Sequence, residues 1–162
     1  MKKTKLFLIF FIFNFFYSEA QTNIIDLKTL EKITNMSSSE FEDWALSKGL
    51  TYEGLESKKY SSFDVLSYKN GSKYQMSILI NKDGTARGFV QYATSNNSEY
   101  INLKKNCSKI GYKFKNSEYV EGDDGNALFH YYYLASRELS FYTSNKDKFY
   151  GFNIILKNKN NR

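Results

Sequence analysis

The chain has 162 residues with a formal net charge of +6, and it contains one histidine and one cysteine. This length suits one compact domain, and the lone cysteine excludes an internal disulfide bond. With one His and one Cys, a zinc site would need several carboxylates as ligands. No glycine-rich phosphate loop follows a predicted strand. We therefore expect neither a metal nor another cofactor.

The first twenty residues predict a secretory signal peptide. A basic start at Lys2–Lys5 precedes an apolar run from Leu6 to Tyr17, and Ser18–Ala20 has small residues where a signal peptidase cleaves. The alternative is a retained anchor, but a membrane-spanning helix needs about 20 apolar residues and this run is shorter. We therefore expect cleavage near Ala20/Gln21, a secreted or periplasmic product, and no membrane span in the mature chain.

Two helices are predicted next. Ile25 to Thr34 has apolar residues at helical spacing, and Ser37–Glu40 forms a capping box that begins a second helix. Phe41 and Trp44 share one face of this helix, which predicts that Trp44 packs in the core, and Gly49 is expected to end it.

Strand patterns follow the second helix. An edge strand is predicted around Leu50 to Glu53, then strands over Ser62–Lys69, Lys73–Asn81 and Ala86–Thr94. The pairs Asn70-Gly71 and Asp83-Gly84 separate these runs and are typical hairpin turns. The region therefore predicts an antiparallel meander.

A similar pattern then begins again. Tyr100, Leu103, Cys107 and Ile110 lie at helical spacing and predict a helix that ends at Gly111. The Lys104–Lys109 segment on this helix predicts a solvated face rather than a nucleic-acid site. The strands expected after it are Tyr112–Phe114, Ala127–Leu134, Arg137–Thr143 and Lys148–Lys157.

The two halves contain matching short segments, which predict a duplicated unit. Gly88-Phe89 matches Gly151-Phe152, and Met76 matches Leu139, each 63 positions apart in the numbering. Asn81-Lys82-Asp83 matches Asn145-Lys146-Asp147 at an offset of 64, so either a turn gained a residue or that match is chance.

We therefore predict an α+β fold of two tandem units, 21–95 and 96–162, within one compact domain. Each unit has helix plus an antiparallel three- or four-stranded sheet, with the helices on one sheet face. This element order resembles the tandem-repeat architecture of the β-lactamase inhibitor protein family, although that family has disulfides. The Lys-, Asn- and aromatic-rich composition is similar to that of exported proteins from Bacteroidetes-type bacteria.

No catalytic constellation is visible. His130 lies in the middle of a predicted strand and is interpreted as a structural residue; a general acid/base role is the alternative, but no partner is identifiable. Cys107 shares an apolar helix face and is interpreted as a small buried hydrophobe. The acidic stretch Glu121–Gly125 lacks the ligand spacing of an EF-hand, so a solvated loop is favoured over a calcium site.

Tyrosine is the feature that points to a function, because 14 Tyr and 14 Phe exceed what one small core is expected to bury. If Leu139 and Phe141 pack inward, Tyr142 faces outward, and either Tyr132 or the pair Tyr131 and Tyr133 does so on the preceding strand. We predict an exported, non-catalytic interaction or inhibitor-like protein that binds a macromolecular partner through Tyr131, Tyr133 and Tyr142. A small glycan- or ligand-binding module is the alternative, and an exported hydrolase is a third, weaker one.

Overall fold

The computed structural model describes residues 25–57, 61–121, 126–144 and 152–158. The predicted signal peptide over 1–20 lies outside these residues, as do the segment 145–147 and the start of the predicted last strand at 148–151. Most of the acidic stretch that begins at Glu121 also lies outside them.

Two helices precede the sheet, as predicted. Helix α2 (Leu27–Ile33) begins at Asp26, whose side chain accepts a hydrogen bond from the Thr29 backbone N–H. Helix α3 (Ser38–Ser47) begins with the predicted capping box, in which the Ser37 backbone N–H donates to the Glu40 carboxylate at 2.8 Å. It is followed by Gly49 at a φ of +71°, which confirms the predicted stop.

Helix α4 (Asn97–Lys109) confirms the third predicted helix, and Gly111 follows it at a φ of +98°. Its N-cap is Asn96, whose side chain accepts from the backbone N–H of Glu99 at 3.2 Å. The Glu99 carboxylate does not return to the cap but accepts hydrogen bonds from Tyr92 and Thr94. The Glu99 carboxylate therefore takes no part in capping α4, unlike the Glu40 carboxylate in α3.

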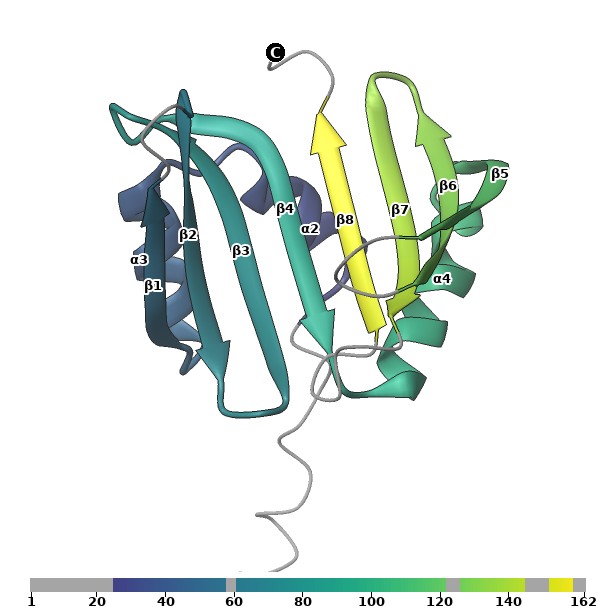
Figure 1. Cartoon of the computed structure of the whole chain (residues 1–162), viewed down its shortest axis with the longest axis horizontal. Coiled ribbons are helices and arrows are strands. Elements are labelled where there is room, and N and C mark those ends of the chain that lie inside the picture. The colour runs from purple at the N-terminus through teal and green to yellow at the C-terminus, as the bar shows by residue number, and fades with distance from the viewer. Residues whose placement is uncertain (1–24, 58–60, 122–125, 145–151, 159–162) are drawn as a thin grey trace, which may run out of the picture.

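The strands form one antiparallel sheet of eight strands in the order β1-β2-β3-β4-β8-β7-β6-β5 (Figure 1). The bounds are Thr51–Ser57 for β1, Phe63–Asn70 for β2, Tyr74–Asn81 for β3, Ala86–Thr94 for β4, Lys113–Val120 for β5, Ala127–Leu134 for β6, Arg137–Ser144 for β7 and Phe152–Asn158 for β8. The two meanders meet where β4 pairs with β8. The sequence patterns predicted the meanders but not this junction, which joins the strands into a single sheet.

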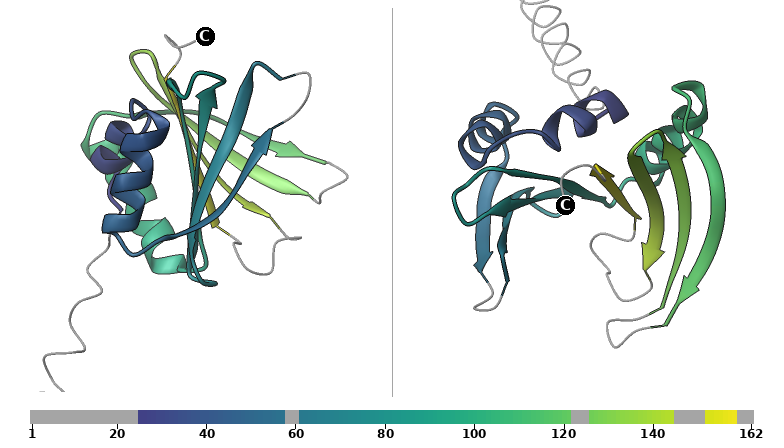
Figure 2. Two further views of the ribbon diagram at one scale, coloured as in Figure 1. Left: turned by 90° about the vertical axis from the view of Figure 1, so that its left-hand side faces the viewer. Right: turned by 90° about the horizontal axis from the view of Figure 1, so that it is seen from above.

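All three described helices lie on one face of the sheet, and the opposite face carries no described helix (Figure 2). The outer strands of both halves project away from the helix layer, so the sheet curves around this uncovered face (Figure 2). The architecture is α+β with the helices on one side, as predicted.

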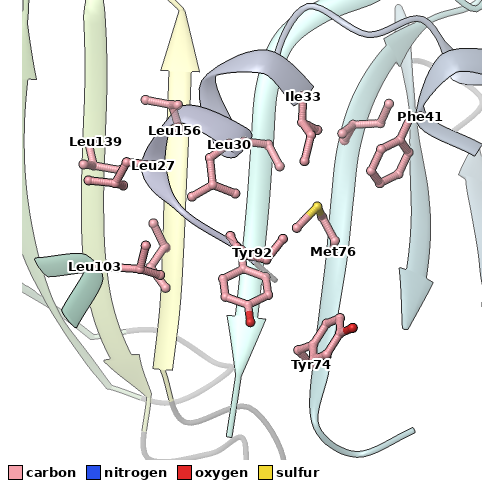
Figure 3. Packing of buried hydrophobic residues seen from close by; sticks show 14 of the residues in the cluster. Leu27, Leu30, Ile33, Phe41, Tyr74, Met76, Tyr92, Leu103, Leu139 and Leu156 are labelled. Carbon is pink, nitrogen blue, oxygen red and sulfur yellow. The ribbon is translucent and has the colours of Figure 1, made fainter. Parts of the chain in front are cut away.

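The core lies between the helices and the sheet (Figure 3). Leu27, Leu30 and Ile33 of α2 lie over the middle of the sheet, where β4 and β8 meet. Burial alternates along β3, so every second side chain faces the helices. Trp44 is partly buried and stacks on Phe41 at 6.0 Å, so the prediction of a core position holds for part of its ring.

Two local features differ from their predictions. The Asn-Gly turn is a three-residue connection, because Asn70 pairs with Tyr74 and the Lys73 backbone N–H donates to the Asn70 carbonyl. Strand β5 runs to Val120, well beyond the predicted end at Phe114, since its pairing with β6 is set by the partner strand and not by its own polar sequence.

The two halves share details beyond element order. Strand β1 has an irregularity after Tyr52, and strand β5 has one after Phe114. These two rings make similar edge contacts, Tyr52 with Tyr68 at 5.6 Å and Phe114 with Tyr132 at 5.5 Å. A duplicated unit stays a prediction, and these matched positions are what it would produce.

Candidate functional site

The three tyrosines predicted as binding residues lie on the uncovered face of the sheet. Leu139 and Phe141 on β7 are fully buried toward the helices, so Tyr142 lies on the opposite side. Strand pairing places Tyr131 opposite Ser140 and Tyr133 opposite Glu138, on the same side as Tyr142. Tyr132 faces the helices and packs against the core.

A phenylalanine links Tyr142 and Tyr131, and Tyr133 lies on the same side of the sheet. Phe129 stacks on Tyr142 with ring centroids 4.4 Å apart, and on Tyr131 at 5.9 Å. We call Tyr142, Phe129, Tyr131 and Tyr133 the aromatic row. Phe129 was not predicted as a site residue, although it has the same position in the β6 alternation as Tyr131 and Tyr133 and could have been found from it.

Hydrogen bonds hold the rings at both ends of the aromatic row. The Tyr142 hydroxyl accepts from Gln91 Nε2 on β4 at 3.1 Å, and the Tyr133 hydroxyl donates to Glu138 Oε2 at 2.7 Å. Burial and the Glu138 carboxylate raise the pKa of Tyr133 to about 12, so its hydroxyl keeps its proton at neutral pH. Burial, followed by the Glu118 carboxylate, also raises the pKa of Tyr131. The row is therefore an ordered surface of neutral rings.

Charged groups on this face form pairs of opposite sign. Lys157 lies 3.7 Å from Glu138, and Lys69 lies 2.6 Å from Glu53 at the other end of the sheet. These pairs give the face a mixed rather than a single-sign character, which does not favour one sign of ligand charge.

The histidine lies on the helix side of β6, away from the aromatic row. Its Nδ1 is hydrogen-bonded to the Ser117 hydroxyl at 2.8 Å. Burial, with a smaller effect of the Lys104 ammonium, lowers the pKa of His130. A serine-type triad would need a carboxylate on the second ring nitrogen, whereas the charged neighbour that shifts this pKa is a cation. His130 is partly buried and hydrogen-bonded, as expected, and its structural rather than acid/base role stays a prediction.

Cys107 is buried, as predicted, and its thiol donates to the Lys104 carbonyl at 2.8 Å. Burial raises the pKa of Cys107, which is the opposite of what a reactive thiolate needs. Within the described residues, no group of three or more His, Cys, Asp and Glu side chains is placed to hold a metal ion. None of the helices described is long and apolar enough to cross a membrane.

A groove of about 310 Å³ lies between α2 and α4. Leu27 and Leu103 contribute apolar walls, and Glu99 is nearly buried beside them. The Glu99 carboxylate accepts from the Tyr92 hydroxyl at 2.7 Å and from Thr94 Oγ1 at 2.9 Å. These two donors hold the carboxylate as part of the core structure. Its only sign in the sequence is a glutamate near a predicted helix start.

Comparison with known proteins adds no identity: no family model matches the chain, and neither a curated protein nor a solved structure matches it.

Proposed function

We propose that this is an exported, non-catalytic binding protein that engages a protein partner, in an inhibitor-like manner, through the aromatic row on the uncovered face of its sheet. The observation that carries the proposal is the stacking of Tyr142, Phe129 and Tyr131 on a face that no described helix covers. Tyrosine is a common anchor of protein interfaces because it offers a large contact area for a small loss of conformational entropy.

The ring geometry favours a protein over a glycan. A sugar stacks on an exposed ring face, whereas Phe129 and Tyr142, with centroids 4.4 Å apart and planes 23° apart, turn one face of each ring toward the other. One face of each of these two rings is therefore covered by the other ring. Side chains of a protein can contact the parts of these rings that remain free, while a pyranose needs a flat, free ring face.

The fixed positions of the rings also support binding by a preformed surface. Gln91 holds Tyr142, and Glu138 holds Tyr133, before any partner arrives. A surface that is already ordered loses less side-chain entropy on association. The paired charges around the aromatic row match a partner of mixed charge. The proposal of export rests on the predicted signal peptide.

The test compares capture by the wild type with capture by Tyr131→Ala and Tyr142→Ala. Each variant is immobilised and exposed to envelope or culture-fluid proteins of the source cell, and the affinity for the retained protein is then measured. We expect each substitution to weaken binding by roughly tenfold or more, the effect of removing an interface anchor worth about 1–2 kcal/mol.

The matched control is Tyr52→Ala. Tyr52 is an exposed tyrosine, 57 % accessible, but it lies on the helix side of β1 beside Tyr68. It should leave capture unchanged. Equal losses in all three variants would contradict the proposal, and retention of the wild type on polysaccharide resin with loss in Tyr131→Ala would establish the glycan-binding alternative instead.

A further inference from the structure

The sheet has two edges, and they differ in how they are protected. Strands β1 and β5 are the outermost strands, and the outer backbone groups of each have no partner among the strands that the structure describes. All eight residues of β5 are exposed. An exposed edge of this length is a template for pairing with another strand, and stable monomers usually block such edges.

Strand β5 also exposes large apolar side chains. Phe114 and Tyr119 are each 58 % accessible and lie on the helix side, where they pair with Tyr132 and Leu128 of β6. Leu128 itself is 42 % accessible. These side chains border the open edge, so a strand added there would cover them.

The charges of β5 lie on the other side of the strand. The Lys115 ammonium lies 4.9 Å from the centre of the Tyr133 ring. Glu118 lies opposite Phe129 on β6, and its carboxylate raises the pKa of Tyr131. Both charged groups therefore lie on the uncovered face. The register shift between Phe114 and Asn116 places Lys115 beside Asn116 on that face.

This distribution makes β5 complementary to itself. In an antiparallel pairing of two β5 strands centred on Ser117, the irregularity brings Glu118 opposite the Lys115–Asn116 pair of the second copy. Tyr119 then lies opposite Phe114. Two-fold symmetry makes each of these contacts twice, with opposite charges matched on one face and aromatic rings matched on the other.

We propose that β5 is a self-association edge, through which two copies of this chain pair antiparallel and continue their sheets into one another. The other edge does not suit a second copy, because β1 carries Glu53 and Glu56 and no basic residue, so its self-pairing would bring carboxylates together. Dimerisation through β5 does not depend on the proposed function, because it uses the edge strand and residues outside the aromatic row.

The test is a charge exchange measured by sedimentation equilibrium. The full chain, expressed with its own N-terminal segment and purified from the host envelope or medium, is compared with Lys115→Glu, Glu118→Lys and the double variant. The wild type should show a monomer–dimer equilibrium in the micromolar range, as expected of a small interface (about 1,000 Å²). Each single variant should weaken dimerisation about tenfold or more, and the double variant should restore it.

The control is Glu56→Lys on β1, which should leave dimerisation unchanged. A wild type that stays monomeric at about 100 µM would overturn the inference, as would a dimer that neither single substitution weakens. Assemblies larger than a dimer that dissociate in Glu56→Lys would also overturn it, since they would show head-to-tail pairing of β1 with β5.

Discussion

Tyrosine serves two different purposes in this molecule, because one side chain combines an apolar ring with a hydroxyl group. The helix-facing core buries more tyrosine than the sequence argument allowed, and it does so by giving several hydroxyls a partner. Tyr92 donates to Glu99, and Tyr112 donates to Glu31 at 3.0 Å. On the other face, the same residue type forms the aromatic row. The buried tyrosines are Tyr68, Tyr74, Tyr92, Tyr100 and Tyr112.

At the same scale, His130 should make stability depend on pH. Its pKa in the folded protein is lowered, chiefly by burial, so below about pH 6.5 the unfolded chain binds more protons than the folded one. Stability that is present at neutral pH is therefore lost as the pH falls through this range. We expect the free energy of unfolding to drop more steeply from pH 7 to pH 5 in the wild type than in His130→Gln.

Urea unfolding at several pH values measures this difference. Carboxylates whose folded pKa is lowered, such as Asp26 and Glu40, lose their contribution at more acidic pH in both proteins and so cancel in the comparison. Parallel pH profiles, or a steeper profile in His130→Gln, would refute the prediction.

The secondary-structure elements follow from local sequence where a local rule decides them. The capping box at Ser37–Glu40 and the alternation along Tyr74–Asn81 each identified an element close to its observed bounds. Where a distant strand decides the bounds of an element, the local sequence predicts those bounds less well. Strand β5 has little apolar alternation and is extended by its neighbour β6, and the tight connection at Ala135, with a φ of +50°, carries no Asn-Gly signal.

The candidate site also depends partly on local sequence and partly on the pairing of distant strands. The outward direction of Tyr142 followed from the inward packing of Leu139 and Phe141 on its own strand, which is a local argument. The stacking with Phe129 needed the register between β6 and β7, and the hydrogen bond from Gln91 needed β4 and β8 to join. The periodicity of a single strand predicts neither pairing, so the aromatic row could not be predicted from the sequence alone.

The start of α3 gives a prediction at the scale of the element. The Ser37 hydroxyl accepts from the Glu40 backbone N–H and donates to its carboxylate, so Ser37→Ala removes both bonds from the first turn. We expect a loss of about 1 kcal/mol in the free energy of unfolding, the usual cost of removing an N-cap. Chemical denaturation measures it.

Ser98→Ala is the matched control, because Ser98 lies in the first turn of α4 and is exposed, and Asn96 supplies the cap there. Its effect should stay within about 0.5 kcal/mol. Similar losses in both variants would show that the Ser37 cap is not what stabilises the start of α3.

For the whole molecule, the junction of β4 and β8 should decide whether the halves unfold together. Val90 lies opposite Leu156 across this junction, and Leu139 lies opposite Leu156 from the other side. All three are almost completely buried in one core that also includes Leu30 of α2. A core shared in this way couples the halves, and domains of this size usually unfold in one transition.

Leu156→Ala tests this coupling. The substitution removes a buried side chain from the junction and should cost about 2–5 kcal/mol. Trp44 is the single tryptophan and lies on α3 in the first half, whereas far-UV circular dichroism reports on all elements. We expect both signals to shift to the same lower denaturant midpoint, because the loss at β8 destabilises the structure around Trp44 equally.

Lys157→Ala, a substitution of the exposed neighbour on β8, should shift neither signal appreciably. A Trp44 transition that stays at its wild-type midpoint, while the circular dichroism signal moves, would mean that the two meanders fold as separate units that merely touch at β4 and β8.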